Sequence, residues 1–470
     1  MKAIPFPQQL RHLSWRAGFG PTPATAESAR NIKQAVKQLF KASEKTEFLQ
    51  VPMPAPVDGM RAKDLGPEQR RKQLQERRQA LMQLNRSWLN QMVTSEAQLR
   101  EKMTLFWHGH FACRLQAPQL LQLQNNTLRK HALGSFSDLL TAVAKDPAML
   151  QFLNNQQNRK QRPNENFARE VLELFTIGRG NYTEQDIKEA ARAFTGWGYN
   201  AEGEYVFRER QHDFGPKTFM GQTGNFNGED ILRIILQDPR TANYLTTKLY
   251  LFFVSDTPHP QRIKELSSYF YKLNYNIAGL LEQIFTANWF YTPEVMGARI
   301  KSPVELLAGL QRMFDVSYSD DRSVLVLQRA LGQELFQPPN VSGWAGGQSW
   351  IDSSTLAFRL RIGPAVLQDA GIEVALKPND DQEPAKPIAR RADGLRIARA
   401  KANISLIEQQ MAKVDTSELP EQLSSFLLQV PLQPHTLQIL KQGMASSSSK
   451  SEQIHYLAQR LLSLPEYQLC

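Results

Sequence analysis

The chain has 470 residues, of which 41% are hydrophobic, 9% aromatic and 22% charged. This ordinary globular composition excludes intrinsic disorder, collagen and coiled coil as descriptions of the whole chain. Lys and Arg number 56 against 46 Asp and Glu, and the net charge of +10 suits an anionic partner. The two cysteines, Cys113 and Cys470, are too few for a disulfide framework.

The sequence contains no uninterrupted apolar window of the ~18 residues that a membrane span needs. Pro5, Pro7 and Arg11 interrupt the stretch in which a secretory signal would carry its apolar core. As written, the sequence therefore predicts a cytoplasmic protein without a membrane span.

The first third of the chain predicts three helices. A short helix is expected over residues 22–41, followed by a proline-rich connector at 51–57 that cannot be helical. A long basic helix is expected over 67–92 and another over 96–108, where apolar residues recur at helical spacing. Runs of basic residues are typical of solvated helix faces and less often of interaction surfaces. The early run consists of Arg61, Lys63, Arg70, Arg71, Lys72, Arg77 and Arg78.

The central region carries clear helix start and stop signals. Asn164 is a candidate N-cap for a helix over 165–177, and Gly178 is its candidate stop. Thr183 with an acidic residue three positions later predicts a capping box for the next helix, which Gly196 ends. Residues 302–305, Ser-Pro-Val-Glu, form a fuller capping box with proline at the first helical position.

Strand signals are sparse, so the predicted fold class is mainly α with short β elements. Residues 205–208 favour a short strand or hairpin arm, and 249–254 suit either a strand or a buried helix. The domain prediction is a large multi-helix body over 1–368, a polar linker over 369–395 and a smaller C-terminal helical segment over 396–470.

The first candidate site motif is Phe-Trp-His-Gly-His-Phe at 106–111. Histidines at i and i+2 point ~200° apart on a helix, and both can face one site only where the helix ends, for which Gly109 gives a reason. Imidazoles are common ligands of zinc, iron and copper, so His108 and His110 are candidate metal ligands. The alternative is that both histidines form hydrogen bonds inside an aromatic helix end.

The second motif is the acidic stretch over 163–173. Glu165, Arg169, Glu170 and Glu173 lie off the apolar face of the predicted helix. Surface salt bridging explains them, since Glu165 and Arg169 form an i,i+4 pair. The functional interpretation is a carboxylate pair that binds metal or acts as general acid and base, with Arg169 holding an anionic group.

The third motif is the loop Arg-Gln-His-Asp-Phe-Gly-Pro-Lys at 210–217. Asp213 could orient His212, or both could bind metal, while Arg210 and Lys217 could neutralise an anion. Loops on a rigid scaffold often carry function, and connection alone does not require this composition.

The fourth motif is a Gly- and Pro-rich loop over 337–354 with two tryptophans. Trp344 and Trp350 could form a platform for a sugar ring or another flat ligand, and Asn340 could supply hydrogen bonds. The equally weighted alternative is that both tryptophans anchor the loop to the helical body.

At these stretches the chain resembles the bacterial family known as domain of unknown function 1800. The stretches that carry the resemblance are HLSWRAGFGPTP (12–23), REKMTLFWHGHF (100–111), PNENFAREVLELFTIGRGNYTEQDIKEAARAFTGW (163–197), RQHDFGPKTFMGQTGNFNGEDIL (210–232), ARIKSPVELLAG (298–309) and GQELFQPPNVSGWAGGQSWIDSSTLAFRL (332–360). They cover roughly residues 12–362, and beyond about residue 370 only a final Leu-Pro-Glu-Tyr resembles the family.

The resemblance implies a large, mainly helical protein, but no activity, substrate or cofactor is established for the family that it could imply. It also implies a sulfatase-like or phosphatase-like neighbour, of the family known as domain of unknown function 1501. Many relatives carry export signals, whereas here the first shared motif begins at His12 and leaves no room for one.

Two functions follow as hypotheses. The first is a hydrolase for an anionic or glycan-type substrate, with a divalent metal that activates water. Its candidate residues are the metal ligands His108, His110 and His212, the catalytic groups Glu165, Glu170 and Asp213, and the substrate-binding groups Arg169, Arg210, Lys217, Asn340, Trp344 and Trp350. The alternative is a non-catalytic binding or assembly protein that partners a sulfatase-like protein or a glycan. Nucleic-acid binding rests on charge alone and is the weakest alternative.

Overall fold

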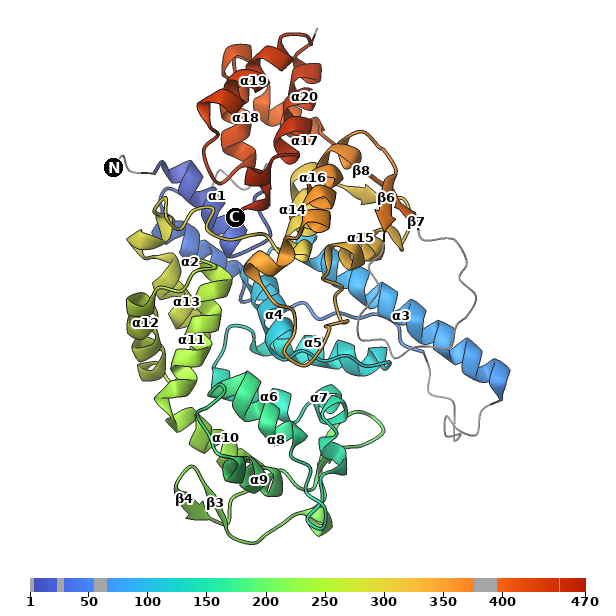
Figure 1. Cartoon of the computed structure of the whole chain (residues 1–470), viewed down its shortest axis with the longest axis vertical. Helices are drawn as coiled ribbons and strands as arrows, with labels where there is room; N and C mark the ends of the chain where they lie inside the picture. The colour runs from blue at the N-terminus through green and yellow to red at the C-terminus, as the bar shows by residue number, and fades with distance from the viewer. Residues whose placement is uncertain (1–3, 23–28, 55–65, 376–394, 448) are drawn as a thin grey trace.

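A computed structural model of the chain describes residues 4–22, 29–54, 66–375, 395–447 and 449–470. Within these residues the protein is mainly helical, as the sequence predicts, with twenty α-helices and four small two-stranded sheets (Figure 1). Most of the predicted linker, residues 376–394, and part of the early basic run, Arg61 and Lys63, lie outside the described residues.

The first two thirds of the chain form thirteen helices, and one large apolar core joins all of them except α3, whose buried side chains belong to a smaller core. They are α1 Phe6–Arg16, α2 Ile32–Ala42, α3 Pro67–Thr94, α4 Gln98–His110, α5 Pro118–His131, α6 Phe136–Ala144, α7 Pro147–Phe152, α8 Asn166–Glu170, α9 Glu184–Ala193, α10 Gly228–Gln237, α11 Pro239–Phe253, α12 Pro260–Lys272 and α13 Ile277–Phe285. Figure 1 places α4 at the centre, α11 to α13 along one side, and α3 extending outward on the other.

A second core joins the helices that follow. They are α14 Pro303–Phe314, α15 Ser323–Leu331, α16 Ser353–Leu367, α17 Ser405–Met411, α18 Leu419–Leu427, α19 Pro434–Met444 and α20 Lys450–Leu462. Leu306 and Ile362, from before the predicted linker, share this core with Leu423 and Leu461 from after it. The C-terminal helices therefore pack against α14 and α16 (Figure 1), and the predicted division at residue 368 stays a prediction.

The strands form antiparallel pairs at the margins of the helical body. They are β1 Trp197–Tyr199 with β2 Tyr205–Phe207, β3 Lys217–Phe219 with β4 Gln222–Gly224, β5 Ser317–Tyr318 with β8 Ala400–Lys401, and β6 Ile372–Ala375 with β7 Leu395–Ala398. The predicted strand at 205–208 is thus a hairpin arm, and 249–253 belong to α11. Residues 372–375, predicted as linker, form a strand because β7 pairs with them.

The predicted helix boundaries hold where a capping side chain sets them. Thr183 accepts a hydrogen bond from Asp186 N and Ser302 accepts one from Glu305 N, each within a capping box. Of the predicted helix at 22–41, residues 23–28 lie outside the described residues, and α2 begins only at Ile32, because Asn31 caps it. The sequence analysis also missed α1, which begins directly after Pro5. None of the helices within the described residues is both long enough and apolar enough to cross a membrane.

Candidate functional site

His108 supports the tryptophan loop from inside the body. Its Nε2 accepts a hydrogen bond of 3.1 Å from the main-chain N–H of Phe336, and its ring packs 4.9 Å from Trp88 and 5.5 Å from Trp344. Complete burial lowers the pKa of His108 to about 3, so the imidazole is neutral. The lone pair of Nε2 that a metal would need therefore already accepts a hydrogen bond.

The tryptophan loop also touches the motif through two glycines. Gly343 adopts a φ of +78°, and a Cβ at this position would overlap the main-chain carbonyl oxygen of Gly109. Only glycine combines that backbone conformation with so close an approach. Residues 336–344 therefore pack directly against the His-Gly-His motif.

His110 lies on another side of the α4 terminus, and its two ring nitrogens have different partners. Nε2 is 3.0 Å from the carbonyl oxygen of Phe175, which only accepts, so Nε2 carries the proton. Nδ1 then accepts from the Lys248 ammonium or amine, 3.3 Å away. Burial and the adjacent Lys248 lower the pKa of His110 well below its usual range, so this ring is neutral as well.

The partner of His110 belongs to a π-helix, η3 Val171–Thr176, where the sequence predicts a regular α-helix. The wider turn changes which carbonyl groups the helix itself can satisfy, and side chains of neighbouring helices bind two of them. The Leu174 carbonyl accepts from Tyr244 Oη at 2.9 Å and from Lys248 Nζ at 3.2 Å. The sequence analysis missed both partners, for which the only local signal is an i,i+4 Tyr–Lys pair on α11.

Most charged groups of the predicted acidic stretch are engaged in ion pairs near the surface. Arg169 donates to both oxygens of Glu184, at 2.9 and 2.8 Å, and to Glu165 at 3.3 Å. Glu173 pairs with Arg179 and accepts from Tyr182 Oη at 2.8 Å. The Arg169 guanidinium, predicted to hold an anionic substrate, thus already holds two carboxylates.

Glu170 differs from its neighbours. It is half-buried and forms no ion pair among the residues that the structure describes. Burial, with a smaller contribution from the Glu173 carboxylate, raises its pKa. Of the three predicted catalytic groups it alone keeps a carboxylate without a charged partner, and its role stays a prediction.

The loop over 210–217 forms a separate network. His212 Nδ1 donates to the Thr195 carbonyl at 2.8 Å, and its ring lies 5.1 Å from Phe207 and 4.7 Å from Phe214. Asp213 accepts from Arg192 at 2.8 Å. The predicted role of Asp213 in orienting His212 is therefore filled by a main-chain carbonyl.

The two predicted anion-binding groups of this loop differ in accessibility. Lys217 is only 1% exposed and donates to the carbonyl oxygens of Asp213 and Gly215 at 2.6 and 3.0 Å, so it stabilises the loop from within. Arg210 is exposed on the short helix η4 Glu209–Gln211. Only Arg210 is placed where it can meet a ligand from solvent.

The two tryptophans of the loop are half-buried or buried, and the predicted aromatic platform stays a prediction. Trp350 is only 8% exposed, which is the burial that the anchoring alternative predicts. Trp344 is half-buried against His108. Asn340 is exposed but its Oδ1 accepts from Ser342 N at 2.9 Å, so it shapes the turn.

The predicted histidines have separate neighbours. His108 contacts the tryptophan loop, His110 the π-helix and His212 the β1–β2 hairpin. In the part of the chain that the structure describes, no group of three or more His, Cys, Asp or Glu side chains is placed to hold a metal ion. The metal-ligand and catalytic assignments therefore stay predictions without a supporting geometry.

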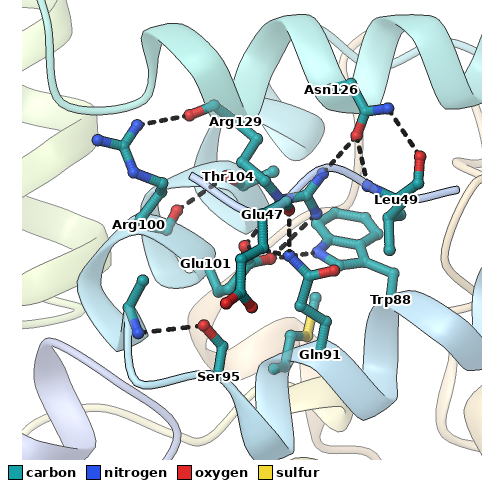
Figure 2. Close-up of polar contacts among 12 residues, drawn as sticks. Glu47, Leu49, Trp88, Gln91, Ser95, Arg100, Glu101, Thr104, Asn126 and Arg129 are labelled. Carbon is teal, nitrogen blue, oxygen red and sulfur yellow. Dashed lines mark hydrogen bonds and ion pairs between the residues drawn. The ribbon is translucent and has the colours of Figure 1, made fainter. Parts of the chain in front are cut away.

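A buried ion network that sequence reasoning missed joins α3, α4 and α5 (Figure 2). Glu101 on α4 accepts from Arg129 at 2.7 and 3.0 Å, from Trp88 Nε1 at 3.0 Å and from Gln91 at 3.0 Å. Both carboxylate oxygens are thus satisfied. Asn126, which accepts from Arg129, also fixes the main chain of Leu49 against α5. This network ties α3, α4 and α5 into one rigid unit.

A second buried network is rich in cations. Lys102 on α4 and Arg299 pair with Glu305 on α14, and all three side chains are at most 5% exposed. Lys301 donates to the Tyr467 carbonyl at 2.6 Å and lies 3.8 Å from the centre of the Trp15 ring. Glu305 is therefore the central counter-ion where the first body meets the C-terminal helices.

The comparisons with known proteins agree with the resemblance seen in the sequence and extend it. The chain matches no curated protein and no solved structure. Residues 12–469 match the model of the family described as "Protein of unknown function (DUF1800)", so the match also covers the C-terminal helices, where the motifs had faded. Because this match covers nearly the whole chain, the protein belongs to the DUF1800 family.

Proposed function

We propose that the protein is a non-catalytic binding protein whose ligand is an acidic polysaccharide. The observation that carries this proposal is the N-terminal half of α3, residues 67–79, here called the α3 arm. None of its residues is buried, whereas α3 packs into the body from Ala80 onward through Leu84 and Trp88. Figure 1 shows this end of α3 reaching beyond the neighbouring helices.

The α3 arm is polar around its whole circumference and carries five cations against two carboxylates, Glu68 and Glu76. The cations are Arg70, Arg71, Lys72, Arg77 and Arg78. Residues 71 and 78 lie on one face of the helix, about 10 Å apart along its axis. Pairs of cations at this interval suit a linear polyanion that runs along the helix.

The composition of the arm also narrows the class of partner. Leu74 is its only large apolar side chain, so it lacks the stripe that inserts into a hydrophobic groove or a membrane surface. A linear polyanion remains, and the sequence shows no helix-turn-helix, zinc-finger or RNA-binding signature that would favour a nucleic acid. A charged polysaccharide therefore fits the arm best.

The metal-assisted hydrolase has less support. Each predicted imidazole has a partner inside the protein, and two open surface depressions, lined by residues of α20 and of α12, contain none of the predicted site residues. Metal analysis of the purified protein tests the hydrolase hypothesis separately. The sulfatase-like partner implied by the resemblance also stays a prediction, which co-purification of the two proteins would check.

The test of the proposal is binding to heparin, a sulfated polysaccharide, at low ionic strength. The triple variant Arg71→Gln/Lys72→Gln/Arg78→Gln should bind roughly tenfold more weakly, because three exposed charge contacts contribute ~0.5 kcal/mol each. The matched control is Arg159→Gln/Lys160→Gln/Arg162→Gln, which removes three exposed cations from another turn. An equal loss of heparin affinity in both variants would show that binding depends only on net charge, and would overturn the proposal. Tighter binding to a DNA duplex than to heparin would replace the polysaccharide with a nucleic acid.

A further inference from the structure

We propose that Arg359 on α16 binds a small oxyanion, inorganic phosphate or sulfate, between this helix and the short helix η8 Pro465–Gln468. The proposal rests on the hydrogen bonds, ion pairs and burial of the side chains at this contact. It is independent of the polysaccharide proposal.

The first argument is the set of hydrogen bonds that the Arg359 guanidinium forms. The side chain is only 1% exposed, and its Nη1 donates to the Lys301 carbonyl oxygen at 3.0 Å and to Gln468 Oε1 at 3.4 Å. Its Nε and Nη2 are buried and have no hydrogen-bond partner among the residues that the structure describes. Buried N–H groups almost always have an acceptor, because an unpaired one costs free energy. The Nε–Nη2 edge therefore requires an acceptor from outside the chain.

The second argument is what the same edge binds elsewhere in this protein. Arg129 donates through Nε and Nη2 to the two oxygens of Glu101, at 2.7 and 3.0 Å. Arg329 holds Glu334 in the same way, at 2.7 and 2.6 Å. These two parallel N–H groups match two oxygens of a carboxylate, a phosphate or a sulfate, whereas a water molecule offers one oxygen. The chemistry of the edge therefore identifies an oxyanion.

The third argument is the missing counter-ion. In the described parts of the chain, no carboxylate lies within ion-pair distance of Arg359. Glu305 acts on it only from further away and is already paired with Lys102 and Arg299. Burial lowers the pKa of Arg359 to about 10, so the guanidinium still carries its charge at pH 7. A buried charge without a partner is costly, and a bound anion removes that cost.

Gln468 supplies a further donor beside the guanidinium. Its amide oxygen faces Arg359, because a guanidinium only donates, and its Nε2 is buried without a hydrogen-bond partner within the described residues. Buried Arg16 differs, since it donates to three main-chain carbonyl oxygens, at 2.7, 2.8 and 3.1 Å, and only its Nε is left over. The unpaired donors of α16 and η8 thus belong to one contact.

The burial of this contact determines how the anion is taken up. Arg359 and Gln468 are at most 2% exposed, so an oxyanion between them is enclosed as the chain folds and exchanges slowly afterwards. Bound only by the folded chain, it stabilises the fold by mass action. It also links α16 to the last residues of the chain, and the C-terminal helices are thereby held against the rest of the second core.

Release of the anion from the full chain tests this proposal. The purified protein is exchanged into a chloride buffer and unfolded in guanidinium chloride, and the phosphate and sulfate that it releases are quantified by ion chromatography. About one equivalent of one of the two ions is expected, and its identity distinguishes phosphate from sulfate.

An anion lost during the exchange is detected by its effect on stability. At constant ionic strength, each tenfold rise in phosphate or sulfate concentration above the dissociation constant should raise the folding equilibrium constant about tenfold. A protein that releases neither ion, and that neither ion stabilises more than chloride does, overturns the proposal.

Variants of α16 assign the ion to its site. Arg359→Met should lose both the released ion and the stabilisation, whereas Arg361→Met, which removes an exposed cation from the same helix, should keep both. Equal amounts of ion in the two variants would place it elsewhere and overturn the proposal. If Arg359→Met does not fold, Arg359→Lys keeps the charge without the two-pronged edge and should bind the ion roughly tenfold more weakly, so unchanged binding would contradict the proposal. Neither result depends on heparin binding.

Discussion

Glu305 supplies the negative charge that compensates the buried cations between the two main cores. Its carboxylate pairs with Lys102 and Arg299, accepts from Ser302 N at 2.7 Å and is almost completely buried. These cations hold the pKa of Glu305 far below its usual range in spite of desolvation. A buried ion pair adds little net stability when intact, but its loss leaves an uncompensated charge.

The variant Glu305→Gln should therefore be strongly destabilised. We expect a loss of about 3–5 kcal/mol in the free energy of unfolding, measured by urea denaturation at pH 7. Glu184→Gln breaks the exposed pair with Arg169 and should cost less than about 1 kcal/mol. A Glu305→Gln variant within 1 kcal/mol of wild type would show that the cations do not depend on this carboxylate.

Lys301 should make the free energy of unfolding increase as the pH rises from neutral to alkaline values. Burial lowers its pKa to about 7 in the folded protein, whereas a lysine in the unfolded chain titrates near ~10.4. Between these values the unfolded state binds more protons, so the cost of burying Lys301 is complete below pH 7 and disappears as the pH rises toward 10. The Lys301→Met variant should thus be more stable than wild type at low pH, and this difference in the free energy of unfolding should disappear at high pH. Urea titrations from pH 6.5 to 9.5 measure the difference, and a pH-independent difference would contradict the shifted pKa.

At the scale of elements, the α4 terminus and the tryptophan loop form one unit. His108 accepts from Phe336 N, and Gly343 lies directly on the carbonyl of Gly109. The same helix end also contacts the π-helix through His110. Two histidines and two glycines therefore fix three chain segments that are far apart in sequence.

Gly343→Ala tests this contact. The new Cβ would overlap the Gly109 carbonyl in a backbone conformation that disfavours alanine, so we expect a loss of at least about 2 kcal/mol. Gly346 in the same loop has a φ of −95° and open space around its Cα, so Gly346→Ala should change stability by less than about 0.5 kcal/mol. Thermal unfolding of the two variants gives the comparison, and similar midpoints would refute the docking of the loop.

The elements that the sequence predicts correctly are those set by neighbours in the chain. Thr183 and Ser302 cap their helices through residues three positions away, so a local pattern suffices. The π-helix and the partners of His110 depend on α11, more than sixty residues further on. Trp350 shows the same limit, because its burial follows from tertiary packing. The sequence motifs point to the candidate site residues, but the spacing of residues in the chain cannot predict which distant groups form hydrogen bonds with them.

At the scale of the whole molecule, the cationic side chains fall into two groups, those buried in ion pairs and those exposed on the α3 arm. Buried cations such as Lys102 and Arg129 are paired inside the body and are unavailable to a ligand. The α3 arm places several cations in solvent on a helix whose other half is anchored beside the rigid Glu101 network (Figures 1 and 2). An anchored but exposed arm can meet a long anionic chain without rearrangement of the body.

The measurement that tests this account most directly is the salt dependence of heparin binding. The logarithm of the association constant should fall linearly with the logarithm of the salt concentration, because each charge contact releases counter-ions. In the variant Arg71→Gln/Lys72→Gln/Arg78→Gln the slope should become shallower by about two units, and in Arg159→Gln/Lys160→Gln/Arg162→Gln it should stay close to the wild-type slope. An identical slope in wild type and the α3 arm variant would show that the arm does not hold the polyanion.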